Sequence, residues 1–236
     1  MKHVLAAAVL GALISSGVAQ AAPLQGQFRI DGSDYDVRVG LDYIDFGPFL
    51  PITTGRFEVT TATLDFAGLD EGTIKDLIAL GVGSVMLDDF VEFDGKEAWN
   101  FTLTDIYPGV GTPAGCNNTP GSLCTPLLPP TFEPSPFTLL NLNPNGSSVS
   151  LSVGGYVTNE LGEVSLWSGK FTSQLDQLSS GQALGRILDD EFGYVQSSWS
   201  AEFTVTPDDT PVPEPASMIL TGLAMSAMAV VLRRRR

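Results

Sequence analysis

The chain has 236 residues, a length that suits one domain of ordinary size together with terminal signals. The part between the first 21 residues and the last four contains 27 aspartates and glutamates but only seven lysines and arginines. A body with this negative charge is repelled by phosphate backbones and anionic lipid headgroups, which argues against a nucleic-acid partner.

The N-terminus has the three-part plan of a secretory signal. Lys2 precedes an apolar run at residues 4–14, and Ala19 and Ala21 place small side chains at the −3 and −1 positions of a cleavage site. We predict a signal peptide at residues 1–21, used by the secretion machinery and removed by signal peptidase. An uncleaved membrane helix is the alternative, which the short run and its interruption by glycine and serine disfavour.

The body, residues 22–206, consists mainly of segments with a period of two. Their apolar side chains alternate with polar ones, mostly Ser and Thr, as in half-buried antiparallel strands. These segments lie at residues 25–31, 35–41, 57–65, 99–104, 148–153 and 199–206. Trp99 and Trp199 are in phase with their apolar neighbours, so we expect both in the core. Roughly eight or nine strands separated by Gly- and Pro-containing turns predict an all-β fold, an antiparallel β-sandwich.

Two stretches have helical spacing instead. Residues 73–80 place Ile74, Leu77 and Ile78 on one side of a helix. Residues 180–190 do the same with Ala183, Leu184, Ile187 and Leu188. We predict one short helix in each stretch.

A proline-rich stretch, residues 108–136, separates the early strands from the late ones. It contains Cys116 and Cys124, the two cysteines of the chain, with seven residues between them. Because an exported protein meets an oxidising compartment, we predict a disulfide that pins a long loop inside a single domain. A boundary between two small domains is the alternative, but each half would have few strands with which to bury a core. A metal site would need further soft or imidazole ligands, and the only histidine, His3, leaves with the signal peptide.

Few residues of the mature chain are suited to catalysis. The loss of His3 excludes triads that use histidine, and paired cysteines argue against a cysteine nucleophile. A hydrolase that uses two carboxylates stays open as an alternative, since some pair among so many acids will have the required separation by chance. The sequence therefore indicates no catalytic residue and no cofactor, and we predict that the protein is not an enzyme.

Two features favour a binding module as an alternative function. Clusters of acidic residues, which could offer oxygen ligands to calcium, lie at residues 31–36, 88–89 and 189–191. Their spacing matches no EF-hand or nonapeptide repeat, and charged turns between strands are usually solvated. Trp167 is out of phase with the apolar residues before it, so we predict that it is exposed and able to stack on a sugar.

The C-terminal part begins with a Pro- and Asp-rich linker, residues 207–215. Residues 216–232 are uncharged, and as a helix they would span about 26 Å at about 1.5 Å per residue, enough to cross a membrane. The positive-inside rule would hold the terminal cluster on the cytoplasmic side: Arg233, Arg234, Arg235 and Arg236. A eukaryotic lipid-anchor signal would end in its apolar run, which argues against that alternative. A plain stop-transfer anchor leaves the Pro-Glu-Pro triplet before the helix unexplained.

Pro213, Glu214 and Pro215, followed by this apolar segment and the arginines, resemble the PEP-CTERM sorting signal of Gram-negative bacteria. The resemblance implies a protein that is exported, held in the inner membrane by its C-terminal helix, and then cut near the triplet by a membrane-embedded exosortase. It also implies a final location at the cell surface or outside the cell, in association with exopolysaccharide and biofilm matrix. The body more weakly resembles the β-rich parts of such proteins, a likeness that implies no activity.

Overall fold

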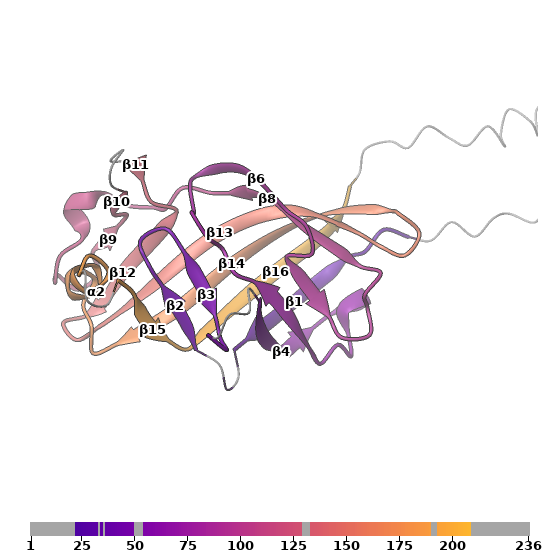
Figure 1. Cartoon of the computed structure of the whole chain (residues 1–236), viewed down its shortest axis with the longest axis horizontal. Helices are drawn as coiled ribbons and strands as arrows, with labels where there is room; N and C mark the ends of the chain where they lie inside the picture. The colour runs from indigo at the N-terminus through magenta and orange to yellow at the C-terminus, as the bar shows by residue number, and fades with distance from the viewer. Residues whose placement is uncertain are drawn as a thin grey trace, which may run out of the picture.

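The computed structural model describes residues 22–32, 34, 36–49, 54–128, 133–189 and 193–208. Antiparallel strands dominate this part of the chain (Figure 1), which confirms the predicted all-β class. The signal peptide, the linker from residue 209 and the C-terminal tail lie outside the described residues. Among the described residues, no helix has the length and apolar character needed to cross a membrane.

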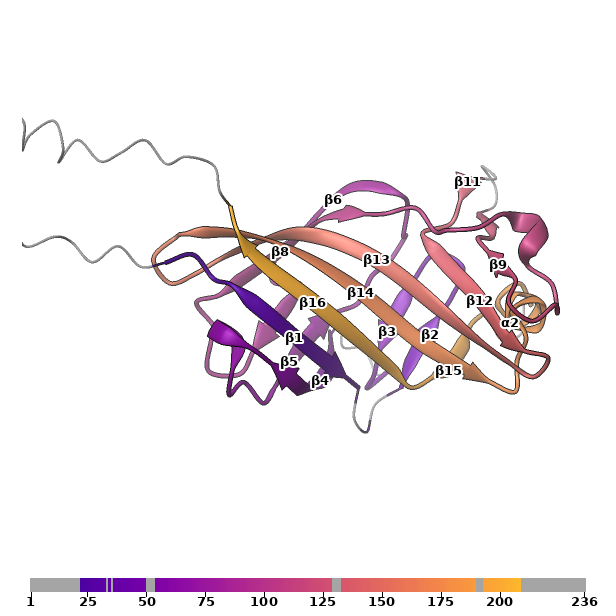
Figure 2. The same cartoon turned by 180° about the vertical axis from the view of Figure 1, so that it is seen from behind.

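Eleven strands form one large sheet that curls into a half-barrel (Figures 1 and 2). They are β1 (Gly26–Asp31), β4 (Thr54–Ala62), β5 (Glu71–Lys75), β6 (Gly83–Leu87), β7 (Val91–Phe93), β8 (Asn100–Ile106), β9 (Leu123–Cys124), β12 (Phe137–Asn143), β13 (Gly146–Thr158), β14 (Val164–Asp176) and β16 (Trp199–Pro207). Their order is β6, β8, β13, β14, β16, β1, β4, β5, β7, while β12 pairs with both β13 and β9. The curl brings the two ends of the sheet together, since Phe90 beside β7 donates a hydrogen bond to the Phe101 carbonyl of β8 at 2.8 Å.

A second sheet packs against the inner face of the large one. It contains β2 (Val37–Val39), β3 (Ile44–Phe46) and β15 (Val195–Ser197), in the order β15, β2, β3, and Figure 1 shows β2 and β3 in front of the large sheet. The ring centroid of Phe46 lies 4.7 Å from that of Trp199 and 5.6 Å from that of Phe171. The two facing layers give the sandwich-like arrangement that the sequence predicted. A two-stranded sheet of β10 (Leu127–Leu128) and β11 (Glu133–Pro134) completes the strands of the described residues.

Aromatic rings fill the space enclosed by the half-barrel. Around Phe28 of β1, ring centroids lie between 4.7 and 5.9 Å away, from Phe66, Phe93, Phe101 and Phe203. Trp99 and Trp199 are buried in the same core, as predicted. Tilted and edge-to-face aromatic contacts add to the free energy gained by burial of these rings.

One of the two predicted helices is present. Helix α2 (Ser180–Ile187) begins with a capping box, in which the side chains and backbone N–H groups of Ser179 and Gln182 bond reciprocally. The other helical segments of the described residues are single 3-10 turns, η1 (Leu64–Phe66) and η2 (Pro113–Gly115). Leu64 has φ of 53° and is 66% exposed, so the strand predicted at residues 57–65 ends at Ala62.

The helix predicted at residues 73–80 is wrong. This stretch contains most of β5, which pairs with β4 and β7, and Leu77 forms an isolated bridge with Ile44. Ile74, Leu77 and Leu80 are buried, but Ile78, which a helix would bury with them, is 73% exposed. Hydrogen bonding to strands on both sides of β5 overrides the local helical spacing.

Asp76 joins the second sheet to the chain after β5. Its Oδ1 accepts a hydrogen bond from the backbone N–H of Phe46 at 2.8 Å. The backbone N–H groups of Ile44 and Leu77 donate to each other's carbonyl oxygens at 2.8 and 2.9 Å. Burial raises the pKa of Asp76 to about 6, the hydrogen bond from Phe46 opposes this shift, and the charge of Asp45 adds to it.

Replacement of Asp76 by Asn tests this raised pKa. Since the pKa is higher in the folded state than the ordinary 3.8, the native state binds a proton more tightly, and wild-type stability should fall as pH rises from about 4 to about 6. A pKa difference of this size corresponds to about 3 kcal/mol, which partial exposure to solvent reduces to about 1 kcal/mol. In urea unfolding, we expect Asp76→Asn to be more stable than wild type by this amount near pH 7.5 and to lose that advantage below about pH 4. A variant that is less stable near pH 7.5 would contradict the assignment.

Candidate functional site

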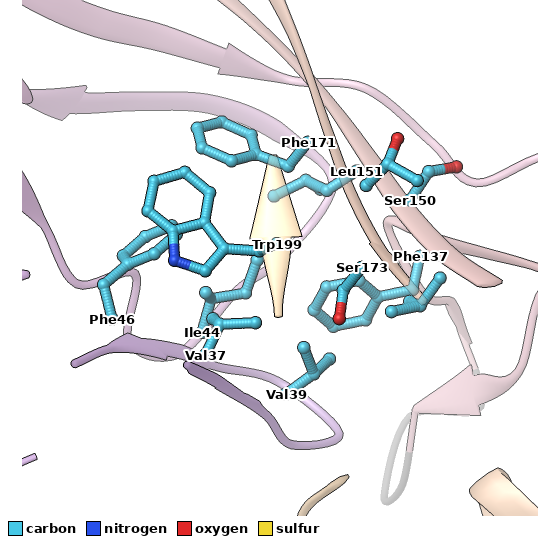
Figure 3. A pocket seen from close by; sticks show the side chains of 12 residues that line it. Val37, Val39, Ile44, Phe46, Phe137, Ser150, Leu151, Phe171, Ser173 and Trp199 are labelled. Atoms are coloured by element: carbon cyan, nitrogen blue, oxygen red, sulfur yellow. The ribbon is translucent and has the colours of Figure 1, made fainter. Parts of the chain in front are cut away.

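A small apolar cavity lies between the two sheets (Figure 3). Its lining includes Val39, Ile44, Phe46, Phe137, Phe171 and Trp199. The cavity volume is about 20 Å³, which is room for about one water molecule and far less than the roughly 300 Å³ of a small-molecule pocket. Within the described residues, Trp199 Nε1 has no hydrogen-bond partner. This cavity is a feature of core packing and too small for an organic ligand.

Two larger hollows lie on the outer face of the large sheet. Figure 2 shows β13, β14, β16 and β1 side by side on this face, with the second sheet behind them. One hollow of about 280 Å³ is lined by Tyr107, Ser152, Val153, Ser168, Gly169, Lys170, Glu202 and Thr204. The other, of about 350 Å³, is lined by Asp31, Gly32, Thr172, Gln174, Ser198, Trp199 and Ser200. Successive outward side chains of β14 and β16 therefore line both hollows.

Tyr107 is the aromatic residue that lines the hollow of about 280 Å³. Its backbone N–H donates to the Ser152 carbonyl at 3.0 Å, which fixes the chain beside β13, and its side chain is 47% exposed. A Cβ atom built at Gly154 would lie 2.7 Å from Tyr107 Oη and 3.3 Å from two of its ring carbons. The absence of a side chain at Gly154 therefore lets the tyrosine ring lie close against the sheet.

The predicted exposure of Trp167 is wrong. Trp167 is 3% exposed, and its Nε1 donates to the Tyr156 carbonyl at 3.0 Å, so it cannot stack on a sugar. Leu166, by contrast, is 50% exposed. Trp167 pairs with Gly155 of β13, where a Cβ would come 2.8 Å from its ring, so this glycine provides the space for the indole on the inner face.

The predicted disulfide is present and ties the proline-rich stretch to the large sheet. Cys116 and Cys124 are bonded, with 5.0 Å between their Cα atoms. Cys124 is buried in β9 and pairs with Leu139 of β12. The loop between the cysteines is thus held at both ends.

Of the acidic clusters, the one at Asp88 and Asp89 lies wholly within the described residues. Asp88 Oδ1 accepts a hydrogen bond from Thr102 Oγ1 at 3.0 Å. Lys75 Nζ lies 3.7 Å from Asp89 Oδ2. In the other two clusters, Ser33, Tyr35, Asp190 and Glu191 lie outside the described residues. In the part of the chain that the structure describes, no three His, Cys, Asp or Glu side chains gather as metal ligands.

Two neighbouring carboxyl groups have a raised pKa: Asp45 in β3 and Asp76, which follows β5. Burial raises the pKa of Asp45, while the neighbouring Arg38, whose Nη1 lies 3.8 Å from Asp45 Oδ2, lowers it. Arg38 also packs against the ring of Tyr194, with its guanidinium carbon 4.8 Å from the ring centroid. Both carboxyl groups have protein partners that hold the second sheet together.

The C-terminal residues define a protein class that the fold of the body does not. These residues, 211–236, lie outside the part of the chain that the structure describes. Residues 211–236 match the family model of the PEP-CTERM protein-sorting motif, so the chain is a PEP-CTERM protein and a substrate of exosortase. None of the curated proteins and none of the solved structures matches the chain.

The disulfide should contribute measurable stability. Replacement of both Cys116 and Cys124 by Ser removes the cross-link from the unfolded chain, and for a ring of this size we expect a loss of about 2–3 kcal/mol in the free energy of unfolding. Urea denaturation without reductant measures this loss. As a control, a reductant should lower the stability of wild type by the same amount and leave the double variant unchanged. Equal midpoints for the two proteins would contradict the prediction.

The role of the triplet is tested by Glu214→Ala in a host that contains exosortase. We expect the variant to keep its C-terminal segment, because the carboxylate between two prolines is the charged group that the processing enzyme can recognise. Intact-mass spectrometry of the purified chain reads the outcome. The matched control is Asp209→Ala, which removes a nearby carboxylate outside the triplet and should leave processing unchanged. Normal processing of Glu214→Ala would show that the triplet is not the recognition element.

Proposed function

We propose that this chain is a non-catalytic protein of the cell surface or extracellular matrix, delivered by exosortase and associated with exopolysaccharide. The sorting motif at residues 211–236 is the observation that carries the proposal. The signal peptide starts export, the C-terminal segment holds the chain in the inner membrane, and processing near Pro213, Glu214 and Pro215 releases the body outside.

The chemistry of the body supports a role without catalysis. After removal of the signal peptide the chain has no histidine, and Cys116 and Cys124 are joined to each other. Histidine-based and cysteine-based mechanisms therefore lack their reacting groups. We propose that the body acts through its surface, without a cofactor.

The outer face of the large sheet also suits a hydrated matrix. Its outward positions on β13, β14 and β16 are mainly Ser and Thr, whose hydroxyl groups both donate and accept hydrogen bonds. Since the body carries a large negative charge, it would be repelled by anionic membranes and nucleic acids and would stay soluble within a polymer network.

Cell fractionation in three hosts tests the proposal. In a host with exosortase and exopolysaccharide, we expect most of the protein in the extracellular polysaccharide fraction. Without exosortase it should remain in the inner membrane, and without exopolysaccharide it should be processed but free in the medium. The same distribution in the first and third hosts would refute association with exopolysaccharide, and retention in the inner membrane of the first host would refute delivery.

A further inference from the structure

The two outer hollows follow one another along the same pair of strands. In the register of β14 and β16, Ser168 pairs with Thr204, Lys170 with Glu202 and Thr172 with Ser200. The first two pairs line one hollow, and the third pair with Gln174 lines the other. From Ser168 to Gln174 the strand rises about 20 Å at about 3.3 Å per residue. We call this elongated surface the outer groove; its length suits an extended polymer better than a single small molecule.

The side chains of the outer groove are available to a ligand. The polar ones comprise two half-buried residues, Thr172 and Thr204, and four exposed residues, Ser168, Lys170, Gln174 and Glu202. Within the described part of the chain, none of them makes a side-chain hydrogen bond or an ion pair with the protein. Hydroxyl, amide, ammonium and carboxylate groups together offer donors and acceptors in close succession, which is the complement of a sugar ring with several hydroxyl groups.

Tyr107 adds an apolar surface at one end of the outer groove. It lines the same hollow as Lys170 and Glu202, and its ring lies close against the sheet over Gly154. A sugar ring has a face of C–H groups that packs on an aromatic ring while its hydroxyl groups point to the sides. A half-exposed tyrosine with polar neighbours provides both kinds of contact, because its body is apolar and its hydroxyl is polar.

Charge selects among polysaccharides. In the strand register, Glu202 of β16 lies directly opposite Lys170 of β14 on one side and Arg29 of β1 on the other. The outer groove thus has charges of both signs close together, while the body as a whole has 27 acidic and seven basic side chains. An anionic polymer would be repelled by the body. Because Lys170 and Arg29 lie directly across the strands from Glu202, the outer groove presents no surface of a single charge sign, and an uncharged polymer fits it best.

From the outer groove and its tyrosine we propose that β14 and β16 bind a neutral linear polysaccharide, one sugar of which stacks on Tyr107. This inference rests on the proposed association with exopolysaccharide and names the surface and the polymer class. Lys170, Glu202 and the Ser and Thr hydroxyl groups bond to the hydroxyl groups of the sugars along the strands.

Calorimetry on the protein secreted by an exosortase-containing host tests the proposal. The probes are neutral hexasaccharides of glucose, mannose, galactose and xylose, the neutral exopolysaccharide of the host, glucose itself, and an alginate hexasaccharide. We expect at least one neutral polymer or hexasaccharide to bind, and to bind at least about tenfold more tightly than glucose or alginate. No binding of any neutral probe, or equal binding of alginate, would overturn the proposal.

Variants locate the site. Tyr107→Ala should lower the affinity at least about tenfold, whereas Tyr107→Phe keeps the ring and should stay within about threefold of wild type. Gly154→Ala pushes the exposed ring away from the sheet and should weaken binding as well. The matched control is Tyr194→Ala, which removes the same side chain from its place against Arg38 at the second sheet and should bind normally. Thermal unfolding verifies that each variant is folded.

The outcomes separate this inference from the proposed function. Wild-type affinity in both Tyr107→Ala and Gly154→Ala would overturn the outer groove as the site, even if the protein is found in the matrix. Loss of affinity in both variants would support the site, even if fractionation places the protein free in the medium.

Discussion

The antiparallel pairing of β13 with β14 is the constraint on which both faces of the body depend. Thirteen residue pairs join the two strands, from Gly146 with Asp176 to Thr158 with Val164. A shift of one residue would exchange the inner and outer faces of β14. In the observed register, Trp167 and Phe171 enter the aromatic core while Lys170 and Thr172 face outward. The stability of the core and the composition of the outer groove are therefore set together.

The sequence predicts those elements whose pattern is local and unambiguous. Strand β16 alternates strictly, and α2 has both a capping box and apolar residues at helical spacing. Strand β14 was missed because apolar Val164 and Leu166 face outward, while small or polar Ser165, Gly169 and Ser173 share the inner face with Trp167. The indole is buried because its pairing partner, Gly155, leaves space for it, and a partner in another strand cannot be read from a local period.

The same distinction applies to function. The sorting signal and the disulfide were predicted because each depends on a short stretch of the chain and on the compartment that the protein enters. The outer groove was not predicted, because it needs Tyr107 after β8, Gly154 in β13 and two further strands in register. The chain thus combines a delivery signal that acts as a linear motif with a body whose surface exists only when folded.

Hydroxyl-radical footprinting of the protein in a host that makes exopolysaccharide tests most directly whether this surface meets the proposed polysaccharide. Modification of Tyr107 is compared with that of Met86, an exposed residue of β6 outside the outer groove, before and after enzymatic removal of the polysaccharide. If the outer groove is occupied, Tyr107 should be protected in the matrix and become reactive once the polymer is removed, while Met86 stays equally reactive. Equal reactivity of Tyr107 under both conditions would contradict binding of the polysaccharide in the outer groove.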